Sequence, residues 1–288
     1  MFGLLNIDKP AGLTSRDAVN RVQRLVRPTK VGHAGTLDPI ATGVLVLCLG
    51  KATRLIEHVQ RLPKSYRGVF LLGRTSPSDD IELPVEELPD ASIPSREEID
   101  AVLPWFVGDI QQTPPVYSAI KVKGEKSYDL ARAGRPPELP PRAVSIYELS
   151  VVAYDYPELT LDVRCSSGTY IRSVGRDVAA ALGTAAVMSG LERTAIGPFR
   201  VAEAIKPDEL VKETLAERLL PAAMAVSDLP RIEANAAELE ELRHGRFLSP
   251  ESRPSGEEIA AYGPTGELVA LLKTHAAGKL QPIRVFLS

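Results

Sequence analysis

The chain has 288 residues, of which 44% are apolar and 25% charged, and its formal net charge is −3. This is the composition of an ordinary globular protein, long enough for one large or two smaller domains. It argues against a membrane-spanning protein, because no apolar run approaches the roughly 20 residues that a membrane helix needs.

The termini and cysteines point to a reducing compartment. The N-terminal sequence MFGLLNIDKP lacks the basic start, long apolar stretch and small-residue cleavage site of a signal peptide. Cys48 and Cys165 lie far apart in apolar or strand-like segments, so we expect buried, reduced thiols rather than a disulfide. The sequence therefore predicts a cytoplasmic protein.

The small net charge hides a segregation along the chain. Residues 1–74 carry 12 Lys and Arg against 4 Asp and Glu, whereas residues 75–110 carry 1 against 10. A polarised surface of this kind can steer a polyanion to one face, although solvated helix faces would leave the same pattern.

The first quarter of the chain alternates strands and helices. Gly and Pro separate the segments, and Thr14 or Ser15 is suited to cap a helix whose apolar residues recur at helical spacing. The predicted elements are a strand at 4–7, a helix from 14 or 15 to 26, a buried strand at 44–49, a helix at 51–61 and a strand at 66–72.

The remainder is less regular. An acidic, proline-containing stretch at 79–100 is expected to be exposed, and Ser95 followed by Glu98 is a capping-box signal for a helix that reaches residue 107. Segment 111–147 combines prolines, a strand that carries a tyrosine, a short helix and six basic residues. Further elements are expected as strands at 144–153 and 159–166, helices at 170–182, 208–220 and 234–243, and short strands at 268–272 and 282–287.

This mixture lacks strict strand–helix alternation, which favours an α+β fold over a doubly wound sheet. The pattern changes after Pro230. We therefore predict a domain of residues 1–229, with an insertion at about 111–147, and a small β-rich domain of residues 230–288.

Several common chemistries are not supported. Gly50-Lys51-Ala52 fails as a P-loop, because six residues separate Gly43 from Gly50 and no Ser or Thr follows the lysine. The four histidines are scattered without metal-ligand spacing, and no G-x-S-x-G elbow is present. We expect no metal and no cofactor.

One carboxylate stands out. Asp38 follows the Gly-rich GHAGTL and precedes Pro39, which restricts the backbone of Asp38 to extended conformations at the entrance of a buried strand. The residues alone leave two interpretations, a catalytic acid or an Asx turn that caps the loop.

An ordered set of segments resembles the TruB family of bacterial tRNA pseudouridine synthases, which act on the uridine at position 55 of the T-loop. These segments are LLNIDKPAGLTS (4–15), GHAGTLDPIATGVLVLCLGKATRL (32–55), KSYRGVFLLG (64–73), PPVYSAIKVKGEKSYDLARAG (114–134), CSSGTYIRSVGRDVAAALG (165–183) and LERTAIGPF (191–199). The resemblance implies a pseudouridine synthase fold with a mixed, largely antiparallel sheet and a PUA-like C-terminal domain.

The resemblance also implies the chemistry. Pseudouridylation breaks the N1–C1′ bond, turns the uracil and joins C5 to C1′, so no redox cofactor is needed. By the resemblance Asp38 is the nucleophile, Arg172 is the arginine that pairs with it by a bidentate hydrogen bond and keeps it charged, and Tyr66 stacks on the base and takes the C5 proton. Attack at C1′, attack at C6 and a glycal route all stay open.

Other residues match positions that bind or support the substrate. By the resemblance Tyr170 and Leu191 line the pocket, Lys9 supports the active-site loops, and His33 contacts RNA near the displaced base, with ordinary packing as the alternative for each. Basic residues of the insertion, among them Lys121 and Lys123, are expected to hold phosphates. The target base must leave the T-loop stack before Asp38 can reach its ribose.

The chain departs from the family in two places. We expect the loop GRTSPSDDIE (73–82) to be one residue shorter than the family pattern G-x-x-T-x-T-x-D-x-x-G, with Pro77 where a Thr is common, no closing Gly, and Asp79 in the place of the acid. Residues 231–288 carry 7 Lys and Arg against 8 Asp and Glu, so contact of this part with the tRNA acceptor stem is only weakly expected.

Two alternatives remain beside a stand-alone tRNA enzyme that is a monomer without an obligatory protein partner. One is a guide-RNA-dependent pseudouridine synthase, whose central motif is similar. The other is a non-catalytic RNA-binding or RNA-folding module, which would not need Asp38, Tyr66 and Arg172 together.

Overall fold

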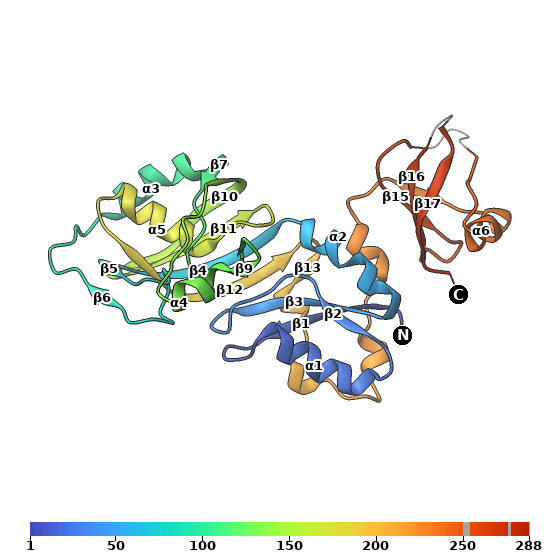
Figure 1. Ribbon diagram of the computed structural model, residues 1–288, viewed down its shortest axis with the longest axis horizontal. Coiled ribbons are helices and arrows are strands. Elements are labelled where there is room, and N and C mark those ends of the chain that lie inside the picture. Colours follow the sequence, from blue (N-terminus) through green and yellow to red (C-terminus); the bar gives the residue numbers. More distant parts are fainter. Residues whose placement is uncertain (250–253, 276–277, 288) are drawn as a thin grey trace.

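The computed structural model describes residues 1–249, 254–275 and 278–287. Its main element is a nine-stranded sheet that extends across the left and centre of Figure 1, with a separate β-rich lobe at the C-terminal end. Along the main path the strand order is β1-β3-β12-β4-β11-β10-β7, while β2 pairs with β3 and β13 pairs with β12. The predicted α+β fold with a mixed, largely antiparallel sheet is confirmed.

The strands of this sheet follow the apolar runs of the sequence. Their bounds are β1 Gly3–Lys9, β2 Val31–His33, β3 Thr42–Leu49, β4 Lys64–Leu72, β7 Gly108–Gln112, β10 Arg142–Asp155, β11 Glu158–Cys165, β12 Ala186–Ile196 and β13 Phe199–Arg200. Cys48 and Cys165 are free, buried thiols, as predicted. Burial raises the pKa of the Cys48 thiol to about 12 and that of Cys165 to about 11.

The sequence analysis missed β12, the strand at the centre of the sheet. It pairs in parallel with β3 and antiparallel with β4, and it is the link between the two halves of the sheet. Its polar residues Glu192, Arg193 and Thr194 interrupt the apolar pattern that would have revealed a buried strand. The parallel contact is short, because only Glu192–Thr42 and Arg193–Gly43 are in register.

The helices α1 and α3 begin where the capping signals at Thr14 and Ser95 predicted. The bounds are α1 Ser15–Val26, α2 Ile56–Arg61, α3 Arg96–Val102, α4 Ser127–Arg132, α5 Ile171–Ala181 and α6 Ala236–Arg243. Thr14, Ser95 and Asn235 each form a complete capping box at the start of α1, α3 and α6. The predicted helix at 51–61 is a 3-10 helix, Gly50–Leu55, that continues into α2.

The predicted helix at 208–220 is wrong. This segment contains only short 3-10 helices, Pro207–Glu209 and Leu215–Arg218. Its ends are held by the outer edge of β1: Leu220 exchanges backbone hydrogen bonds with Leu4, and Ile205 pairs beside Ile7. Covering this edge satisfies backbone groups that a regular helix would leave exposed, so tertiary contacts override the helical pattern.

The predicted tyrosine-bearing strand in the insertion is also wrong. Residues 113–120 are irregular, because Pro114 and Pro115 cannot join a ladder. A small hairpin of β8 Lys121–Val122 and β9 Glu125–Lys126 follows and leads into α4, the predicted short helix. A second small hairpin pairs β5 Arg74–Thr75 with β6 Glu86–Glu87 in the acidic stretch.

The C-terminal lobe is a four-stranded sheet in the order β14-β15-β16-β17. The bounds are β14 Arg231–Glu233, β15 Ile259–Tyr262, β16 Leu268–Thr274 and β17 Leu280–Val285. Residues 250–253, 276–277 and 288 of the predicted domain 230–288 lie outside the described residues. This part is β-rich, as predicted.

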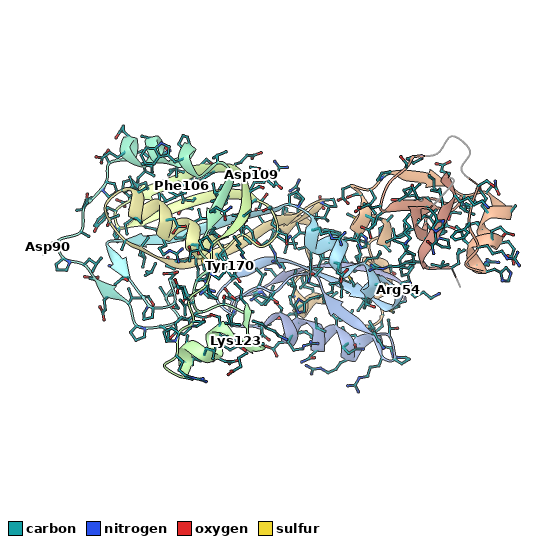
Figure 2. The ribbon with its side chains drawn as sticks, turned by 45° about the horizontal axis from the view of Figure 1, so that its top comes forward. Arg54, Asp90, Phe106, Asp109, Lys123 and Tyr170 are labelled. Carbon is teal, nitrogen blue, oxygen red and sulfur yellow. The ribbon has the colours of Figure 1, made fainter. Side chains whose placement is uncertain are left out.

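Polar contacts connect the lobe to the segment around α2. Arg54, labelled at this junction in Figure 2, donates to the Val285 carbonyl at 2.9 Å, and Lys51 donates to the Leu287 carbonyl at 2.7 Å. Glu258 accepts from both His58 and Arg61.

No helix in the described part of the chain is long and apolar enough to cross a membrane.

A glycine in α5 offers a test of this packing. Gly175 lies against the ring of buried Phe70, and an added Cβ would be 2.1 Å from Phe70 Cε1. Replacing a helical glycine by alanine normally stabilises a protein by about 1 kcal/mol. We expect Gly175→Ala instead to lower the free energy of unfolding by about 1–3 kcal/mol, because the core is overfilled. Denaturant unfolding measures this change.

The control is the same substitution in a Phe70→Leu background, where the smaller side chain leaves room. There the loss caused by Gly175→Ala should shrink. A Gly175→Ala protein that is more stable than the parent would contradict the packing of α5 on β4.

Candidate active site

A cleft of about 730 Å³ lies between the main sheet and the insertion. It brings together five of the predicted site residues, Asp38, Tyr66, Tyr170, Arg172 and Leu191. They come from the loop before β3, from β4, from the N-terminal end of α5 and from β12. Residues far apart in the sequence therefore share one wall, because β12 and β4 are neighbours and α5 packs on both.

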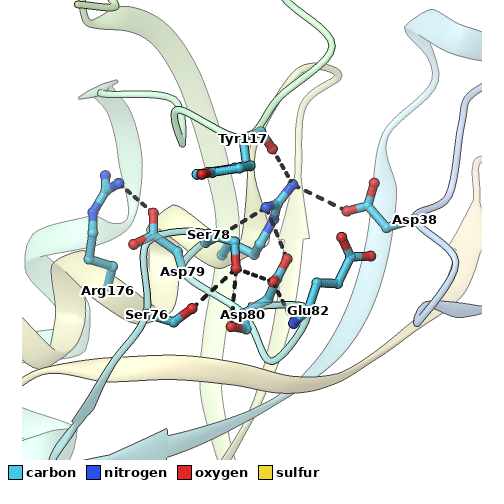
Figure 3. Close-up of polar contacts among 9 residues, drawn as sticks. Asp38, Ser76, Ser78, Asp79, Asp80, Glu82, Tyr117 and Arg176 are labelled. Atoms are coloured by element: carbon cyan, nitrogen blue, oxygen red, sulfur yellow. Dashed lines mark hydrogen bonds and ion pairs between the residues drawn. The ribbon is translucent and has the colours of Figure 1, made fainter. Parts of the chain in front are cut away.

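The guanidinium of Arg172 contacts four residues around this cleft, Asp38, Ser78, Asp80 and Tyr117, which Figure 3 labels. Its Nη2 lies 3.3 Å from Asp38 Oδ2 and donates to the Tyr117 carbonyl at 3.0 Å. Its Nη1 lies 3.0 Å from Asp80 Oδ2 and donates to the Ser78 carbonyl at 2.8 Å. Arg172 thus joins α5 to three separate loops.

The expected pairing of Arg172 and Asp38 is present, but the bidentate geometry is wrong. Only Nη2 reaches Asp38, since Nη1 is occupied by Asp80 and Ser78. The side chain of Asp38 is 42% exposed, whereas those of Arg172 and Asp80 are 8% and 1% exposed. The buried pair is therefore Arg172–Asp80, and Asp38 lies beside it with one face open to the cleft.

The interpretation of loop 73–82 needs correction. Asp79 does not fill the place of the family acid: it has a left-handed backbone (φ 59°) and pairs with Arg176 at 2.9 Å. Asp80 meets Arg172 instead, and its Oδ1 accepts from Ser78 Oγ and from the backbone of Glu82. Counted from Gly73, the pattern G-x-x-S-x-S-x-D has the family spacing with Ser in place of Thr, so no residue is missing. This signal was available in the sequence.

Glu82 is a further carboxylate that the sequence analysis missed. It lines the cleft, and in Figure 3 its side chain points toward Asp38. Burial, and then the neighbouring charges of Asp80 and Asp38, raise the pKa of Glu82. Asp38 and Asp80 therefore share the guanidinium of Arg172, and Glu82 is a third acid nearby on which the charges of Arg172 and Arg132 both act.

Two tyrosines form part of the cleft wall. Tyr66 is buried in β4, and this burial raises the pKa of its hydroxyl. Tyr170 caps α5 and exchanges two hydrogen bonds with the Gln112 side chain, one through its N–H at 2.8 Å and one through its carbonyl at 3.1 Å. The guanidinium of Arg142 lies 4.7 Å from the centroid of the Tyr170 ring.

Lys9 lies behind the cleft rather than in it. It is fully buried and donates to the carbonyls of Pro10 at 2.9 Å, Leu13 at 2.7 Å and Pro39 at 3.4 Å, so it connects the loop after β1 to the loop that carries Asp38. Burial lowers the pKa of Lys9, while the negative charge of Asp38 opposes that shift.

His33 and two insertion lysines are not brought to the cleft wall. His33 ends β2, and burial lowers its pKa. Lys121 and Lys123 lie on the β8–β9 hairpin, and Figure 2 shows Lys123 on the insertion, at a distance from Tyr170. The residues of the insertion that do line the cleft are Tyr117, Ser118, Ala119, Lys126, Tyr128 and Arg132.

The insertion presents a positively charged aromatic surface to the cleft. The Lys126 ammonium lies 5.2 Å and the Arg132 guanidinium 5.5 Å from the centroid of the Tyr128 ring.

Within the described ranges no three His, Cys, Asp or Glu residues are grouped so that they could hold a metal ion.

Two family models match this chain. Residues 23–171 match the N-terminal domain of the TruB family of pseudouridylate synthases, and residues 229–287 match the C-terminal domain of tRNA pseudouridine synthase II.

Relatives extend the match over nearly the full chain. The tRNA pseudouridine synthase B of Caulobacter vibrioides is 41% identical and covers 99% of this chain and 96% of its own. The enzyme of the same name from Thermobifida fusca is 40% identical and covers 99% and 98%. Among solved structures, a Cbf5–Nop10–Gar1 complex matches with a TM-score of 0.79 at 27% identity, over 99% of this chain and 85% of the matched chain.

The adjacent acids Asp79 and Asp80 make a matched pair for testing the Arg172 network. Asp80→Asn removes a buried charge opposite Arg172, and we expect it to lower the free energy of unfolding by on the order of 3 kcal/mol. Asp79→Asn should change stability little, because burial already raises the pKa of Asp79 and asparagine tolerates the left-handed backbone. Denaturant unfolding of both variants measures the difference, and equal losses would contradict the assignment of Asp80.

Proposed function

The chain belongs to the TruB family of pseudouridylate synthases, and we propose that it converts uridine 55 in the T-loop of tRNA to pseudouridine, with Asp38 as the nucleophile. Relatives named tRNA pseudouridine synthase B, about 40% identical over nearly the full chain, support tRNA as the substrate. Residues 1–229 would form the catalytic domain and residues 230–288 the C-terminal domain.

The observation that carries this proposal is the position of Asp38. Its carboxylate meets Arg172 on one side and opens on the other into the cleft that Tyr66 and Leu191 also line. An acid in this place can reach the ribose of a nucleoside whose base lies against the Tyr66 ring. The ionised carboxylate is the nucleophilic form of an aspartate, and Arg172 holds this carboxylate at the edge of the cleft.

The reaction requires the base to leave the T-loop stack. Unstacking costs a few kcal/mol, which contacts inside the pocket offset. Asp38 then promotes cleavage of the N1–C1′ bond, by attack at C1′, by attack at C6 or by assisting formation of a glycal. Tyr66 takes the proton from C5 after the C5–C1′ bond has formed. The RNA backbone would be held outside the cleft by Lys126 and Arg132, together with the exposed Lys121 and Lys123, which makes binding sensitive to salt.

The alternative, a guide-RNA-dependent synthase, would need a guide RNA in addition to the chain itself. The fold of this chain is also that of the matched chain in a Cbf5–Nop10–Gar1 complex, where protein partners are present. The two relatives described above carry the name tRNA pseudouridine synthase B, in which no partner protein appears. We therefore propose that this chain acts on the T-arm alone, as a monomer without guide RNA or partner protein, in the cytoplasm.

A minimal T-arm stem-loop with tritium at C5 of the target uridine tests the function directly. The purified chain should release tritium without any accessory component. Asp38→Asn keeps the shape of the side chain but removes its nucleophilicity, so release should stop while the affinity for the stem-loop stays near that of the parent. Release by Asp38→Asn at the parent rate would refute the catalytic assignment, and a parent that needs a guide RNA would favour the alternative.

A second variant tests the arginine. Arg172→Lys keeps a positive charge, but an ammonium cannot reach Asp38, Asp80 and the two carbonyls of Ser78 and Tyr117 together. We expect single-turnover rates to fall by roughly 100-fold or more. Turnover within a few-fold of the parent would count against a role for the planar fork. Arg176→Lys, which changes the neighbouring arginine one helical turn away, is the control.

A further inference from the structure

Arg193 is a fully buried cation that the proposed reaction leaves without a role. It lies in the middle of β12, and it is 2% exposed. Within the part of the chain that the structure describes, no carboxylate lies within ion-pair distance of its guanidinium. A buried charge without a counterion is costly, so its position calls for an explanation.

The guanidinium of Arg193 donates to three backbone carbonyls of the segment that carries Asp38. Nε donates to Val44 at 2.8 Å, Nη2 to Gly35 at 3.2 Å and Nη1 to Thr36 at 3.4 Å. The two chains approach closely at this point, because a Cβ on Gly43 would be 2.4 Å from the Arg193 carbonyl oxygen. Arg193 therefore fixes both ends of the Asp38 loop to β12.

Arg193 also lies directly opposite Tyr66 in the antiparallel pairing of β12 and β4. Directly paired residues project to the same face of a sheet, so the guanidinium and the phenol are neighbours. The charge of Arg193 lowers the pKa of Tyr66, against the larger effect of burial. The other charged or titratable groups that act on Tyr66 are Cys165 from β11 and Asp38 from its loop, and both raise its pKa.

The charge of Arg193 acts on other groups beneath the cleft as well. It lowers the pKa values of Lys9 and Lys64, in addition to the larger effect of their burial. Three cationic side chains, Lys9, Lys64 and Arg193, thus lie close to Tyr66 and Asp38. Of these, only the guanidinium of Arg193 keeps its charge at every pH, because arginine is not deprotonated in proteins.

We propose that Arg193 is a positioning residue with two roles: it holds the Asp38 loop through its three carbonyl contacts, and its uncompensated charge stabilises Tyr66 as the phenolate that accepts the C5 proton. This inference rests on the proposed function. In the step concerned the C5–H bond breaks and the phenolate oxygen gains the proton. The C–H electron pair forms the C5–C6 double bond, the C6–N1 double bond becomes a single bond, and N1 keeps its electron pair and takes up a proton from solvent.

The two roles are separated by the isotope effect at C5. Single-turnover rates are measured for the full chain on T-arm RNA with hydrogen or deuterium at C5 of the target uridine. Arg193→Gln keeps hydrogen-bonding groups for the carbonyls but removes the charge. We expect its rate to fall by about 100-fold, a primary C5 isotope effect larger than that of the parent, and partial recovery at alkaline pH, where the phenolate forms without help.

Arg193→Lys is the matched variant, since it keeps the charge and loses the fork. We expect a slower enzyme without an enlarged C5 isotope effect at neutral pH. A buried lysine ammonium loses its proton below its ordinary pKa of about 10.4. As pH rises through the range in which the Arg193→Gln enzyme has not yet recovered, the isotope effect should therefore emerge in the same folded protein. This titration keeps the proposal testable if the Gln variant does not fold. Arg67→Gln, an exposed arginine of β4 paired with Asp162, is the control and should behave as the parent.

The outcomes are decisive. A slowed Arg193→Gln enzyme whose C5 isotope effect equals that of the parent would overturn the role toward Tyr66, and an unchanged rate would overturn both roles. An enlarged isotope effect in Arg193→Lys already at neutral pH, equal to that of Arg193→Gln, would overturn the argument from charge. If the parent itself releases no tritium from C5, the proposed function fails and this inference fails with it; if the parent is active, a failure concerns Arg193 alone.

Discussion

The site depends on a single guanidinium shared by four partners. Arg172 comes from the first turn of α5 and binds Asp80, Ser78, Tyr117 and Asp38. Asp80 is the buried counterion, and it is itself held by Ser78 Oγ and the backbone of Glu82. Because a planar fork with fixed donors satisfies these partners at once, the position of Asp38 is set by the fold of three loops and not by its own sequence neighbours.

The sheet brings these loops to one place through β12. Inserted between β3 and β4, it places Leu191 at the cleft wall, pairs Arg193 with Tyr66 and carries Arg193 beneath the Asp38 loop. Its short parallel contact with β3 requires a glycine at position 43, since any side chain there would collide with the backbone of Arg193. A glycine at the start of a buried strand thus has a structural reason in the close approach of two backbones.

The sequence predicted those features that local chemistry determines. Thr14 and Ser95 mark helix starts because their capping boxes are complete within four residues. It did not predict the conformation of residues 208–220, which end in backbone hydrogen bonds to the edge of β1. It also missed β12, where Arg193 donates to a carbonyl of the neighbouring strand β3 and interrupts the apolar pattern. The meeting of Asp38 with Arg172 follows from no spacing rule, as 134 residues separate them; the resemblance to a family supplied that pairing. The role of Asp80 could have been predicted from the sequence, because its serine-containing loop keeps the family spacing.

The distribution of charge around the cleft bears on which part of an RNA can enter. Asp38 and Glu82 line the cleft on the side of Arg172, whose buried counterion is Asp80. At the insertion, Lys126 and Arg132 flank the Tyr128 ring. A phosphate would be repelled by Asp38 and Glu82 and attracted to Lys126 and Arg132 on the opposite, insertion side of the cleft. Under the proposed function, this arrangement favours a nucleotide whose uncharged base and sugar turn inward while its phosphates stay outside, which is the geometry of a flipped base. The same acids that disfavour a phosphate thus add to the selection of a base that has left its stack.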